Sequence, residues 1–409
     1  MKKVLVPKVR FKGFGEEWKE ERFDNIFFNI QEKNKNIYSI KEYISVASNT
    51  WKKDVNIKNK QTLWNYSVFR VGDIAYEGHT NEAFPFGRFV INRIGTGIIS
   101  NIFTVFRPKA DLSLDFSQYW VNNNLVMIGL LKRSSKSGIM MNSLTLENVN
   151  EEKISLPKYS EQQKIGKLLD QISNLITLEQ SKLNKLKQLK ETLLQKMFPE
   201  GNSKTPRIRF KGFEGEWKEE KLEEIGQTYT GLSGKTKKDF GHGNSRYITY
   251  LNIFNNPIAN LKGLDRIEED CKQNSVKYGD IFVTTSSEIP EEVGITSIWP
   301  FKDKENIYLN SFCFGIRLNN INNYYINFLA YNLRNNELRK DIVLLAQGIS
   351  RFNISNRRFM KLNILLPNIS EQQKIGDFFS NIDTLINLYN SKLNKLKQIK
   401  EALLQKMFV

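Results

Sequence analysis

Residues 231–236 read GLSGKT and form the segment of the sequence that comes closest to a phosphate-binding loop. Such a loop needs four residues between its first glycine and the Gly-Lys-Ser/Thr that follows, and it leads from a strand into a helix. Here only two residues separate the glycines, and Tyr229 stands where the first glycine is required. The sequence therefore favours a basic surface loop that continues into Lys237 and Lys238. A phosphate-handling enzyme built on this segment remains a competing interpretation.

The other reactive residue types are too few or too scattered for a catalytic site. Cys271 and Cys313 cannot make a disulfide framework or a four-ligand zinc site, and we expect them to be small apolar residues of the core. His79 and His242 leave little for a metal centre or a catalytic triad. Residues 256–258 read NPI, so the Asn-Pro-Pro-aromatic motif of an amino-methyltransferase is missing. The sequence predicts no catalytic residues, no metal and no cofactor in this chain.

The basic excess of the chain indicates an anionic partner. Lys and Arg number 61 against 44 Asp and Glu, which gives a formal charge of +17. The 409 residues are 40% apolar and 12% aromatic, enough for packed cores, and the length suggests about two to four structural units. The apolar run near the N-terminus ends at Pro7, and no stretch of about 18 apolar residues follows. We therefore expect a cytoplasmic protein with no membrane partner.

Basic residues mixed with small polar ones suit DNA, because Lys and Arg position phosphates while polar side chains reach base edges. We predict such clusters at comparable places in the two halves of the chain, although a solvated surface charge is the simpler interpretation of any single lysine. The predicted DNA-contacting residues are Lys52, Lys53, Lys58, Lys60, His79, Thr80, Asn81, Arg133, Ser135 and Lys136 in the first half, and Lys235, Lys237, Lys238, Thr284, Thr285, Ser286, Ser287, Gln347, Ser350 and Arg351 in the second.

An internal repeat organises the elements that must position these clusters. Residues 160–198 and 370–408 share 27 of 39 residues at an offset of 210, and residues 7–26 and 206–225 share 12 of 20 at an offset of 199. The middles between these matched ends are largely unlike each other. Two units of about 200 residues are domains rather than the short repeats of a solenoid. The sequence predicts a pseudo-twofold molecule with one frame and two different surfaces.

The repeated segments 160–198 and 370–408 predict two long helices that pair through a coiled-coil seam. Steps of four and three residues give ten seam positions in each copy, of which eight and nine are apolar. Ser160 and Ser370 are the predicted N-caps. Antiparallel pairing of helices about 55 Å long would separate the modules; the alternative is that each helix packs on its own domain. The apolar seam residues are Ile165, Leu169, Ile172, Ile176, Leu183, Leu186, Leu193 and Met197, then Ile375, Phe379, Ile382, Ile386, Tyr389, Leu393, Leu396, Leu403 and Met407.

The modules between these ends are predicted to be α+β. Gly-Asp turns at Gly72 and Gly279 each precede a β-rich run. The predicted strand regions are Phe69–Tyr76, Ile98–Arg107, Val276–Thr284 and Asn310–Leu318, and the predicted helices are Asp115–Leu131 and Asn323–Leu344.

Two segments carry a resemblance to a known family. Leu156–Gly166 and Leu366–Gly376 both follow the pattern Leu-Pro-x-x-Ser-Glu-Gln-Gln-Lys-Ile-Gly, and each opens a long Lys/Leu-rich helix. The Gly-Asp-Ile turns, and the segments at Gly138 and Gly348 that lie 19 residues before each proline, support the match. On these marks the whole chain resembles the specificity subunit of a type I restriction–modification enzyme.

The resemblance implies an α+β fold of two target-recognition domains, separated by two long helices that form an antiparallel coiled coil. The domains would span residues 1–156 and 201–366, and the conserved helical regions residues 157–200 and 367–409. Each domain would read one half of a bipartite, asymmetric site on double-stranded DNA, while the helices set the half-site spacing.

The resemblance also implies partners that supply the chemistry. The helices would dock two methyltransferase subunits, which transfer a methyl group from S-adenosylmethionine to adenine N6. Two restriction subunits that use ATP and Mg²⁺ can join in such systems, so that the assembled complex is both a site-specific deoxyribonuclease and an adenine-specific DNA methyltransferase. This chain would be non-catalytic. A scaffold that binds acidic proteins is a third interpretation, which a steep salt dependence of DNA binding would argue against.

Overall fold

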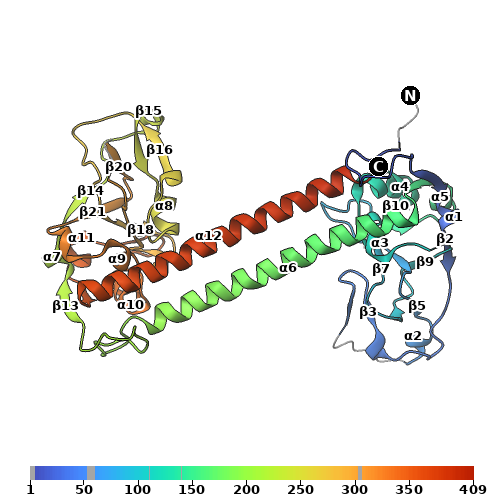
Figure 1. The fold of residues 1–409 in the computed structure, drawn as a ribbon, viewed down its shortest axis with the longest axis horizontal. Helices are drawn as coiled ribbons and strands as arrows, with labels where there is room; N and C mark the ends of the chain where they lie inside the picture. The colour runs from blue at the N-terminus through green and yellow to red at the C-terminus, as the bar shows by residue number, and fades with distance from the viewer. Residues whose placement is uncertain (1–4, 53–59, 110, 140, 303–305) are drawn as a thin grey trace. The chain divides into compact units, whose positions relative to one another are not determined.

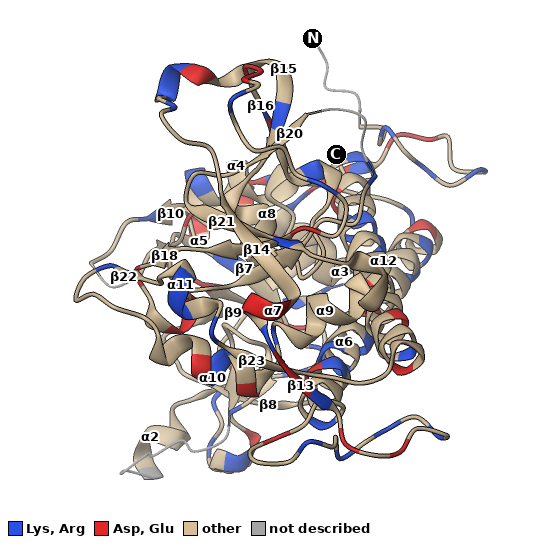
Figure 2. Ribbon diagram, turned by 90° about the vertical axis from the view of Figure 1, so that its left-hand side faces the viewer, with Lys and Arg blue, Asp and Glu red and all other residues tan. Residues whose placement is uncertain are grey.

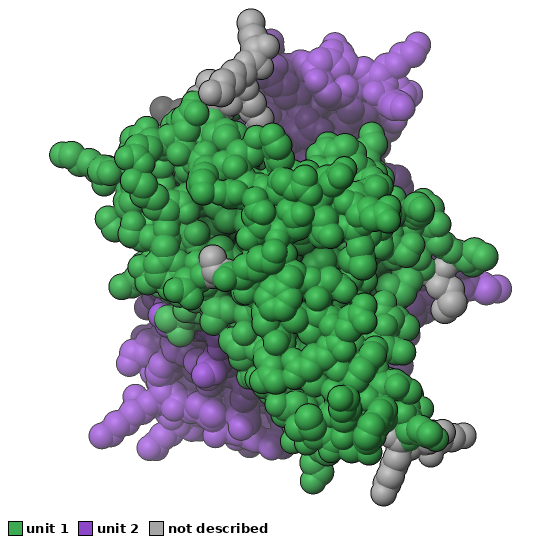
Figure 3. Space-filling model, turned by 90° about the vertical axis from the view of Figure 1, so that its right-hand side faces the viewer, with its two compact units in different colours: residues 1–180, 391–409 green, residues 181–390 purple. Residues whose placement is uncertain are grey.

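The computed structural model describes residues 5–52, 60–109, 111–139, 141–302 and 306–409 (Figure 1). The chain divides into two compact units, which Figure 3 distinguishes by colour. Unit 1 comprises residues 1–180 and 391–409, and unit 2 comprises residues 181–390. The helical regions that the resemblance sets apart as separate segments therefore belong half to one unit and half to the other.

Each unit contains its own antiparallel sheet of four strands, and the strands of the two sheets follow the same order. Unit 1 orders it β2 (Phe27–Ile30), β9 (Thr104–Pro108), β6 (Ile74–Glu77) and β7 (Arg88–Ile91). Unit 2 orders it β14 (Gly226–Thr230), β21 (Cys313–Leu318), β17 (Ile281–Thr284) and β19 (Thr296–Ile298). β6 and β17 are buried along their whole length, which explains why both read as apolar runs rather than alternating strands.

A short ladder joins the two ends of each recognition module. It pairs β1 (Lys19–Arg22) with β12 (Lys153–Leu156) in unit 1, and β13 (Lys218–Lys221) with β23 (Asn363–Leu366) in unit 2. The register is the same in both, since Lys19 faces Leu156 and Lys218 faces Leu366. In each unit the repeated N-terminal segment is thus hydrogen-bonded to the strand that leads into the long helix.

The predicted α+β class is confirmed, but three predicted elements are divided. Asp115–Leu131 consists of α3 (Leu114–Trp120) and α4 (Asn124–Ser134), and Asn323–Leu344 consists of α9 (Ile326–Asn332) and α10 (Asn336–Leu344). The cause is an asparagine N-cap in each case: Asn123 accepts from the Leu125 N–H, and Asn335 accepts from the Leu338 N–H. Ile98–Arg107 is likewise two strands, β8 (Gly97–Ile99) and β9.

Smaller elements complete the shared frame. They are α1 (Phe23–Ile26), α5 (Leu146–Glu151), β10 (Ser135–Lys136) and β11 (Ser143–Leu144) in unit 1, and α7 (Leu222–Ile225), α11 (Asn356–Phe359), β18 (Ser286–Ser287) and β22 (Phe352–Asn353) in unit 2.

The middles differ in structure as well as in sequence. Unit 1 adds β3 (Ile44–Ser45) with β4 (Thr50–Trp51), β5 (Ser67–Phe69) with β8, and α2 (Lys60–Trp64). Unit 2 instead adds the nine-residue β15 (Phe240–Ile248) between β16 (Leu264–Ile267) and β20 (Ile307–Leu309), followed by α8 (Tyr250–Asn255). One frame therefore carries two different inserts.

The long helices are α6 (Tyr159–Lys196) and α12 (Ile369–Lys406). Every predicted seam residue is buried or half-buried, as a coiled-coil seam requires. In each unit the halves of α6 and α12 that belong to it lie side by side in opposite chain directions (Figure 1). The polar seam position Glu179 accepts from Lys392 at 3.0 Å in unit 1, and Lys190 bonds Asp383 in unit 2.

The largest hydrophobic core of each unit includes residues from both long helices or their ends. In unit 1, Met407 and Phe408 pack with Trp18 and Phe116. In unit 2, Phe198 packs with Trp217, Phe328 and Phe379. The alternative in which each helix packs only on its own domain is therefore wrong.

The predicted N-caps are also wrong, because both helices begin one residue earlier than Ser160 and Ser370. The side chain of Asn368 takes the capping role in α12 by accepting from the Glu371 N–H at 3.0 Å. The first helical residue of α12 is therefore Ile369, and the predicted cap Ser370 lies within the first turn.

The Ser-Glu-Gln-Gln segment of α6 ties the helix to the rest of unit 1. Glu161 is fully buried and accepts from Arg10 Nε at 2.6 Å and Nη2 at 2.8 Å. Gln162 donates to the Pro157 carbonyl and accepts from the Ser113 N–H. Gly166 lets α3 approach closely, since a Cβ there would lie 2.4 Å from the Phe116 nitrogen. A bidentate, buried pair of this kind fixes the helix to the arm that carries Arg10.

Unit 2 repeats these contacts residue for residue. Glu371 accepts from Arg209 Nε and Nη2, both at 2.7 Å. Gln372 donates to the Pro367 carbonyl and accepts from the Tyr325 N–H. A Cβ at Gly376 would lie 2.6 Å from the Phe328 nitrogen. The repeated sequence motif is therefore a repeated structural joint.

We expect removal of Arg10 to destabilise unit 1 strongly. Arg10→Met leaves the Glu161 carboxylate buried without its partner, which costs about 3–5 kcal/mol of unfolding free energy. Arg10→Met/Glu161→Leu removes both charges and should recover most of that loss. Arg22→Met, which breaks an exposed pair with Asp24, should cost less than about 1 kcal/mol. Urea unfolding followed by tryptophan fluorescence measures all three, and equal losses for the Arg10 and Arg22 single variants would contradict the role of burial.

Candidate nucleic-acid interface

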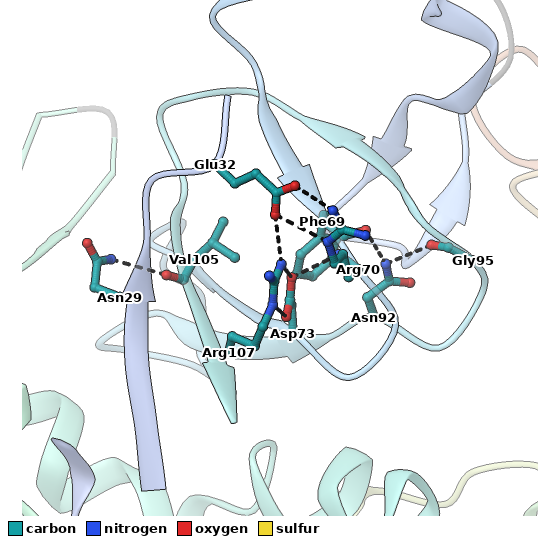
Figure 4. A network of polar contacts seen from close by, with 9 residues as sticks. All are labelled: Asn29, Glu32, Phe69, Arg70, Asp73, Asn92, Gly95, Val105 and Arg107. Carbon is teal, nitrogen blue, oxygen red and sulfur yellow. Dashed lines mark hydrogen bonds and ion pairs between the residues drawn. The ribbon is translucent and has the colours of Figure 1, made fainter. Parts of the chain in front are cut away.

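The Gly-Asp turn of unit 1 is held by a charged network (Figure 4). Gly72 adopts φ +90°, a conformation that favours glycine. Asp73 is buried and accepts from the Arg70 N–H at 2.9 Å. Arg107, on β9, donates to both oxygens of Asp73 at 2.8 Å. The turn and two neighbouring strands of the sheet are therefore locked together by one carboxylate.

Glu32 extends this network toward the surface. It accepts from Arg70 Nη2 at 2.5 Å and from Arg107 Nη2 at 3.2 Å. The hydrogen bond from Arg70 is the largest cause of the lowered pKa of Glu32. On the other side of the turn, the Asn92 amide donates to the carbonyls of Phe69 and Gly95 (Figure 4). The chain around the turn is thus held by side-chain hydrogen bonds on two sides.

Unit 2 builds the same joint with a different third residue. Gly279 has φ +82°, and Asp280 accepts from the Lys277 N–H at 2.8 Å. Arg317 donates to the two Asp280 oxygens at 3.0 and 2.7 Å. Tyr229 donates its hydroxyl to Asp280 at 2.7 Å, and burial, together with that carboxylate, raises the pKa of Tyr229 well above its ordinary value. The Asp–Arg pair belongs to the shared frame, while its neighbours differ.

In unit 1, the loop that follows β6 contacts the segment that contains the predicted cluster at residues 133–136. The Asn142 N–H, just before β11, donates to the Gly78 carbonyl at 2.8 Å. Gly78 has no room for a side chain, since a Cβ would lie 1.9 Å from the Asn142 oxygen. The exposed His79 contacts the buried Glu77 at 2.9 Å, and Glu77 also accepts from Arg88. The clusters around residues 79–81 and 133–136 are therefore held by adjoining segments.

The corresponding loops of unit 2 also come together. β18 pairs with β22, and the Ile354 N–H donates to the Thr285 carbonyl at 2.9 Å. Arg351 stacks over the ring of Phe312, with its guanidinium carbon 5.6 Å from the ring centroid. In both units, then, the loop after the Gly-Asp strand borders the segment that contains Gly138 or Gly348.

Most of the predicted contact residues that the structure describes are available to a ligand. Ser135, Lys235, Thr285 and Ser287 are half-buried. Lys53 and Lys58 lie outside the described residues, and Lys60 is the first residue of α2. The exposed set is Lys52, His79, Thr80, Asn81, Arg133, Lys136, Lys237, Lys238, Gln347, Ser350 and Arg351.

Several predicted residues are buried or paired within the fold. Thr284 is fully buried and accepts from the Ile295 N–H at 2.9 Å, and Ser286 is 7% exposed within β18. A buried side chain cannot contact DNA in this conformation, so both leave the candidate set. Lys235 pairs with Asp270 at 2.8 Å, and Arg133 donates to Glu152 at 2.6 Å. Their charges are partly neutralised locally.

Sequence reasoning missed three exposed apolar residues that lie among these loops. Phe312 is 53% exposed beneath Arg351, and Ile139 and Ile349 are almost completely exposed. The signal for the isoleucines was present, since Gly-Ile recurs at 138–139 and 348–349 with the offset of 210 that relates the helices. Phe312 has no such repeat.

The structure also decides against the phosphate loop. Residues 231–236 lead into the three-residue 3₁₀ turn Lys237–Asp239 and then into β15, with no α-helix whose N-terminus could hold a phosphate. Within the described residues, no group of three or more His, Cys, Asp or Glu side chains is arranged to hold a metal ion. No helix in the described part of the chain combines the length and apolar character needed to cross a bilayer.

Comparison with known proteins defines the class. A family described as the type I restriction modification DNA specificity domain matches residues 15–188 and 214–398. Two relatives from Methanocaldococcus jannaschii are the putative type I restriction enzyme MjaX specificity subunit, 25% identical over 47% of this chain, and the MjaVIII specificity subunit, 23% identical over 62%. These alignments cover 45% and 60% of the relatives, so the chain is matched to less than two thirds of either.

Solved structures show the same fold over nearly the whole chain. The S subunit of a type I restriction–modification system from M. genitalium has a TM-score of 0.58 at 15% identity and is aligned over 99% of both chains. The HsdS subunit from Thermoanaerobacter tengcongensis has a TM-score of 0.50 at 16% identity and is aligned over 96% of both. The chain belongs to the family of type I restriction–modification specificity subunits.

The Lys235–Asp270 pair makes a prediction about pH. The Lys235 hydrogen bond, followed by the Lys272 N–H, lowers the pKa of Asp270 from 3.8 to about 2. The folded-state pKa lies below the unfolded one, so this contribution to stability is present above pH 3.8 and is lost as the pH falls toward 2. Lys235→Ala should return the Asp270 pKa toward 3.8, whereas Lys238→Ala should leave it near 2. A carbon-13 NMR titration of the carboxyl groups measures both, and an unchanged pKa in Lys235→Ala would refute the assignment.

Proposed function

We propose that this chain is the DNA-recognition subunit of a type I restriction–modification enzyme. Each unit reads one half of a bipartite, asymmetric site on double-stranded DNA, and the paired helices set the spacing of the halves. The chain directs adenine N6 methylation, and restriction where restriction subunits are present, without catalysing either. The observation that carries the proposal is one repeated frame, with the Asp–Arg joint and the same sheet order, that supports two different sets of loops.

Two equivalent apolar surfaces on the long helices support the docking of two copies of one partner. Leu175, Leu178 and Ile399 of unit 1 are 41%, 50% and 41% exposed. Leu385, Leu388 and Leu189 of unit 2 stand at the corresponding positions and are 46%, 61% and 51% exposed. Exposed apolar residues that recur in both units favour a buried contact with identical partners. We assign these surfaces to two methyltransferase subunits.

The chemistry belongs to the partners in this proposal. S-adenosylmethionine binds the methyltransferase subunits, and ATP and Mg²⁺ bind the restriction subunits. This chain contributes specific DNA affinity, in which Lys and Arg neutralise phosphates and the loops of each unit contact base edges. A scaffold for acidic proteins is less well supported, because nothing in such a role requires two different loop sets on one frame.

Exchange of one set of loops tests independent recognition. Replacing residues 226–345 with the equivalent middle of another specificity subunit should change one half of the methylated sequence and leave the other half unchanged. The reason is that each middle is held within its own unit by its own sheet. Methylome sequencing of cells that carry the chimera reads both halves at once. A change in both halves would contradict the proposal.

Charged substitutions on the exposed helix positions test docking. Leu178→Glu should remove one methyltransferase subunit and Leu388→Glu the other, with affinity for the affected copy roughly tenfold or more weaker because a leucine contact of about 1.5–3 kcal/mol is lost. Leu261→Glu, which changes a residue of 46% exposure outside the long helices, is the matched control. The mass of the complex by light scattering after gel filtration gives the stoichiometry. Retention of two partner subunits by the double variant would place the interface elsewhere.

Helix length tests the control of spacing. One heptad inserted in α6 and one at the matching point of α12 preserves the seam and adds about 10 Å of helix. At about 3.4 Å per base pair, the spacer should lengthen by up to about three base pairs, while both half-site sequences stay the same. Methylation across a library of spacer lengths measures this. An active variant that keeps the original spacer would show that the helices do not set it.

A further inference from the structure

A turn in each unit places an exposed isoleucine next to a closely packed glycine. Gly138 lies against the carbonyl of Met141, where a Cβ would be 2.2 Å from the oxygen, and Gly348 lies in the same way against the carbonyl of Arg351, at 2.1 Å. The next residue in each turn is Ile139 or Ile349. Ile349 is 98% exposed, and Ile139 is fully exposed.

Both turns are anchored at their base, so the exposed tip is held in place. In unit 1, Ser135 pairs with Leu144 and Lys136 with Ser143. In unit 2, Gln347 and Asn353 exchange backbone hydrogen bonds of 2.9 and 2.8 Å. A fully exposed isoleucine gains nothing from burial in the folded chain. Its recurrence at both tips points to a contact with a partner that both units share.

The surrounding charge identifies that partner as an anion. Residues 116–146 contain no Asp or Glu but contain Lys132, Arg133 and Lys136, of which Arg133 pairs with Glu152. Residues 342–370 likewise contain no Asp or Glu, and they include four basic residues, Arg351, Arg357, Arg358 and Lys361. Arg357 and Arg358 are exposed on α11, which is blue in Figure 2. Glu288 follows β18 and, because Ser287 pairs with Phe352, stands at the same end of the ladder as Arg351, so the exposed cations of α11 supply the unpaired positive charge beside this turn.

We propose that Ile139 and Ile349 make apolar contacts with the bases of the DNA half-site that their own unit reads. This inference rests on the proposed function and adds the residues that enter the half-site. The neighbouring cations, Lys136 in unit 1 and Arg351 in unit 2, hold phosphates, which brings each tip to the groove. There the isoleucine packs on a thymine methyl group or against the face of a base pair, since aliphatic side chains make both kinds of contact.

The test uses the chain assembled with its methyltransferase subunits and a duplex that carries the sequence methylated in cells. Ile139→Ser and Ile349→Ser should each bind this duplex roughly tenfold more weakly, the value of one buried aliphatic side chain. Each variant should relax discrimination at base pairs of one half-site only, so each is the control for the other. Ile208→Ser, an aliphatic residue of 41% exposure in the N-terminal arm of unit 2, should change neither.

Salt dependence separates the apolar contact from phosphate binding. Neither isoleucine variant removes a charge, so the slope of log affinity against log salt should stay at the wild-type value, whereas Lys136→Ala should reduce it by about 0.9. Uracil in place of thymine in the half-site distinguishes the two forms of contact. If uracil weakens the binding of the wild type but not that of Ile139→Ser, the isoleucine contacts the thymine methyl group. If uracil weakens the binding of neither, the isoleucine contacts the face of a base pair.

Two results would overturn the inference. The first is unchanged affinity and discrimination in both isoleucine variants when the wild-type complex binds its site. The second is loss of a methyltransferase subunit from either variant on gel filtration, which would make the tips protein contacts. Failure of the wild-type complex to bind any methylated sequence would instead refute the proposed function itself.

Discussion

Closure of each hydrophobic core by residues distant in the sequence is the constraint on which the rest of this structure depends. Phe408, one residue before the last, packs on Trp18 and Phe116 in unit 1. Phe198 packs in the same way on Trp217 and Phe328 in unit 2. Neither unit is complete without the end of the long helix that begins in the other. The strong identity of residues 160–198 and 370–408 follows, because each copy must satisfy two different sets of neighbours along its length.

The seam between the long helices is apolar except where it specifies the pairing. Glu179 with Lys392 and Lys190 with Asp383 bring two of the three polar seam residues into opposite-charge pairs, and the third, Lys400, lies over the ring of Tyr119. Glu179 is 3% exposed, so displacement of the helices by one turn would leave its carboxylate buried away from its lysine. Such a penalty selects one register at some cost in stability, as polar seam residues do in other coiled coils. Register matters in this chain because it fixes which helix ends reach which core.

The sequence predicted what is local or repeated, and it failed where a side chain acts through a distant partner. Seam residues such as Leu183 and Leu393 followed from periodicity, and the Gly72 and Gly279 turns followed from composition. The role of Asp73 and Asp280 could not be read, because Arg107 and Arg317 lie 34 and 37 residues further along the chain. The burial of Thr284 was missed for a related reason: a Thr-Thr-Ser-Ser run reads as surface, yet the first threonine ends a strand that is buried throughout. Short asparagine caps divided two helices that periodicity alone would have continued.

The placement of charge explains why one frame tolerates two unrelated surfaces. The charged groups of the frame are largely paired, at Arg10–Glu161, Asp73–Arg107 and their counterparts in unit 2, so they add little to the field outside the molecule. The excess of +17 includes exposed cations of the loops and their borders, such as Lys136, Lys237 and Arg351. Under the proposed function, substitution at such positions would change what is bound without removing a contact that holds the sheet. A recognition surface built in this way can diverge in sequence while the joints at Asp73 and Asp280 keep its loops in place.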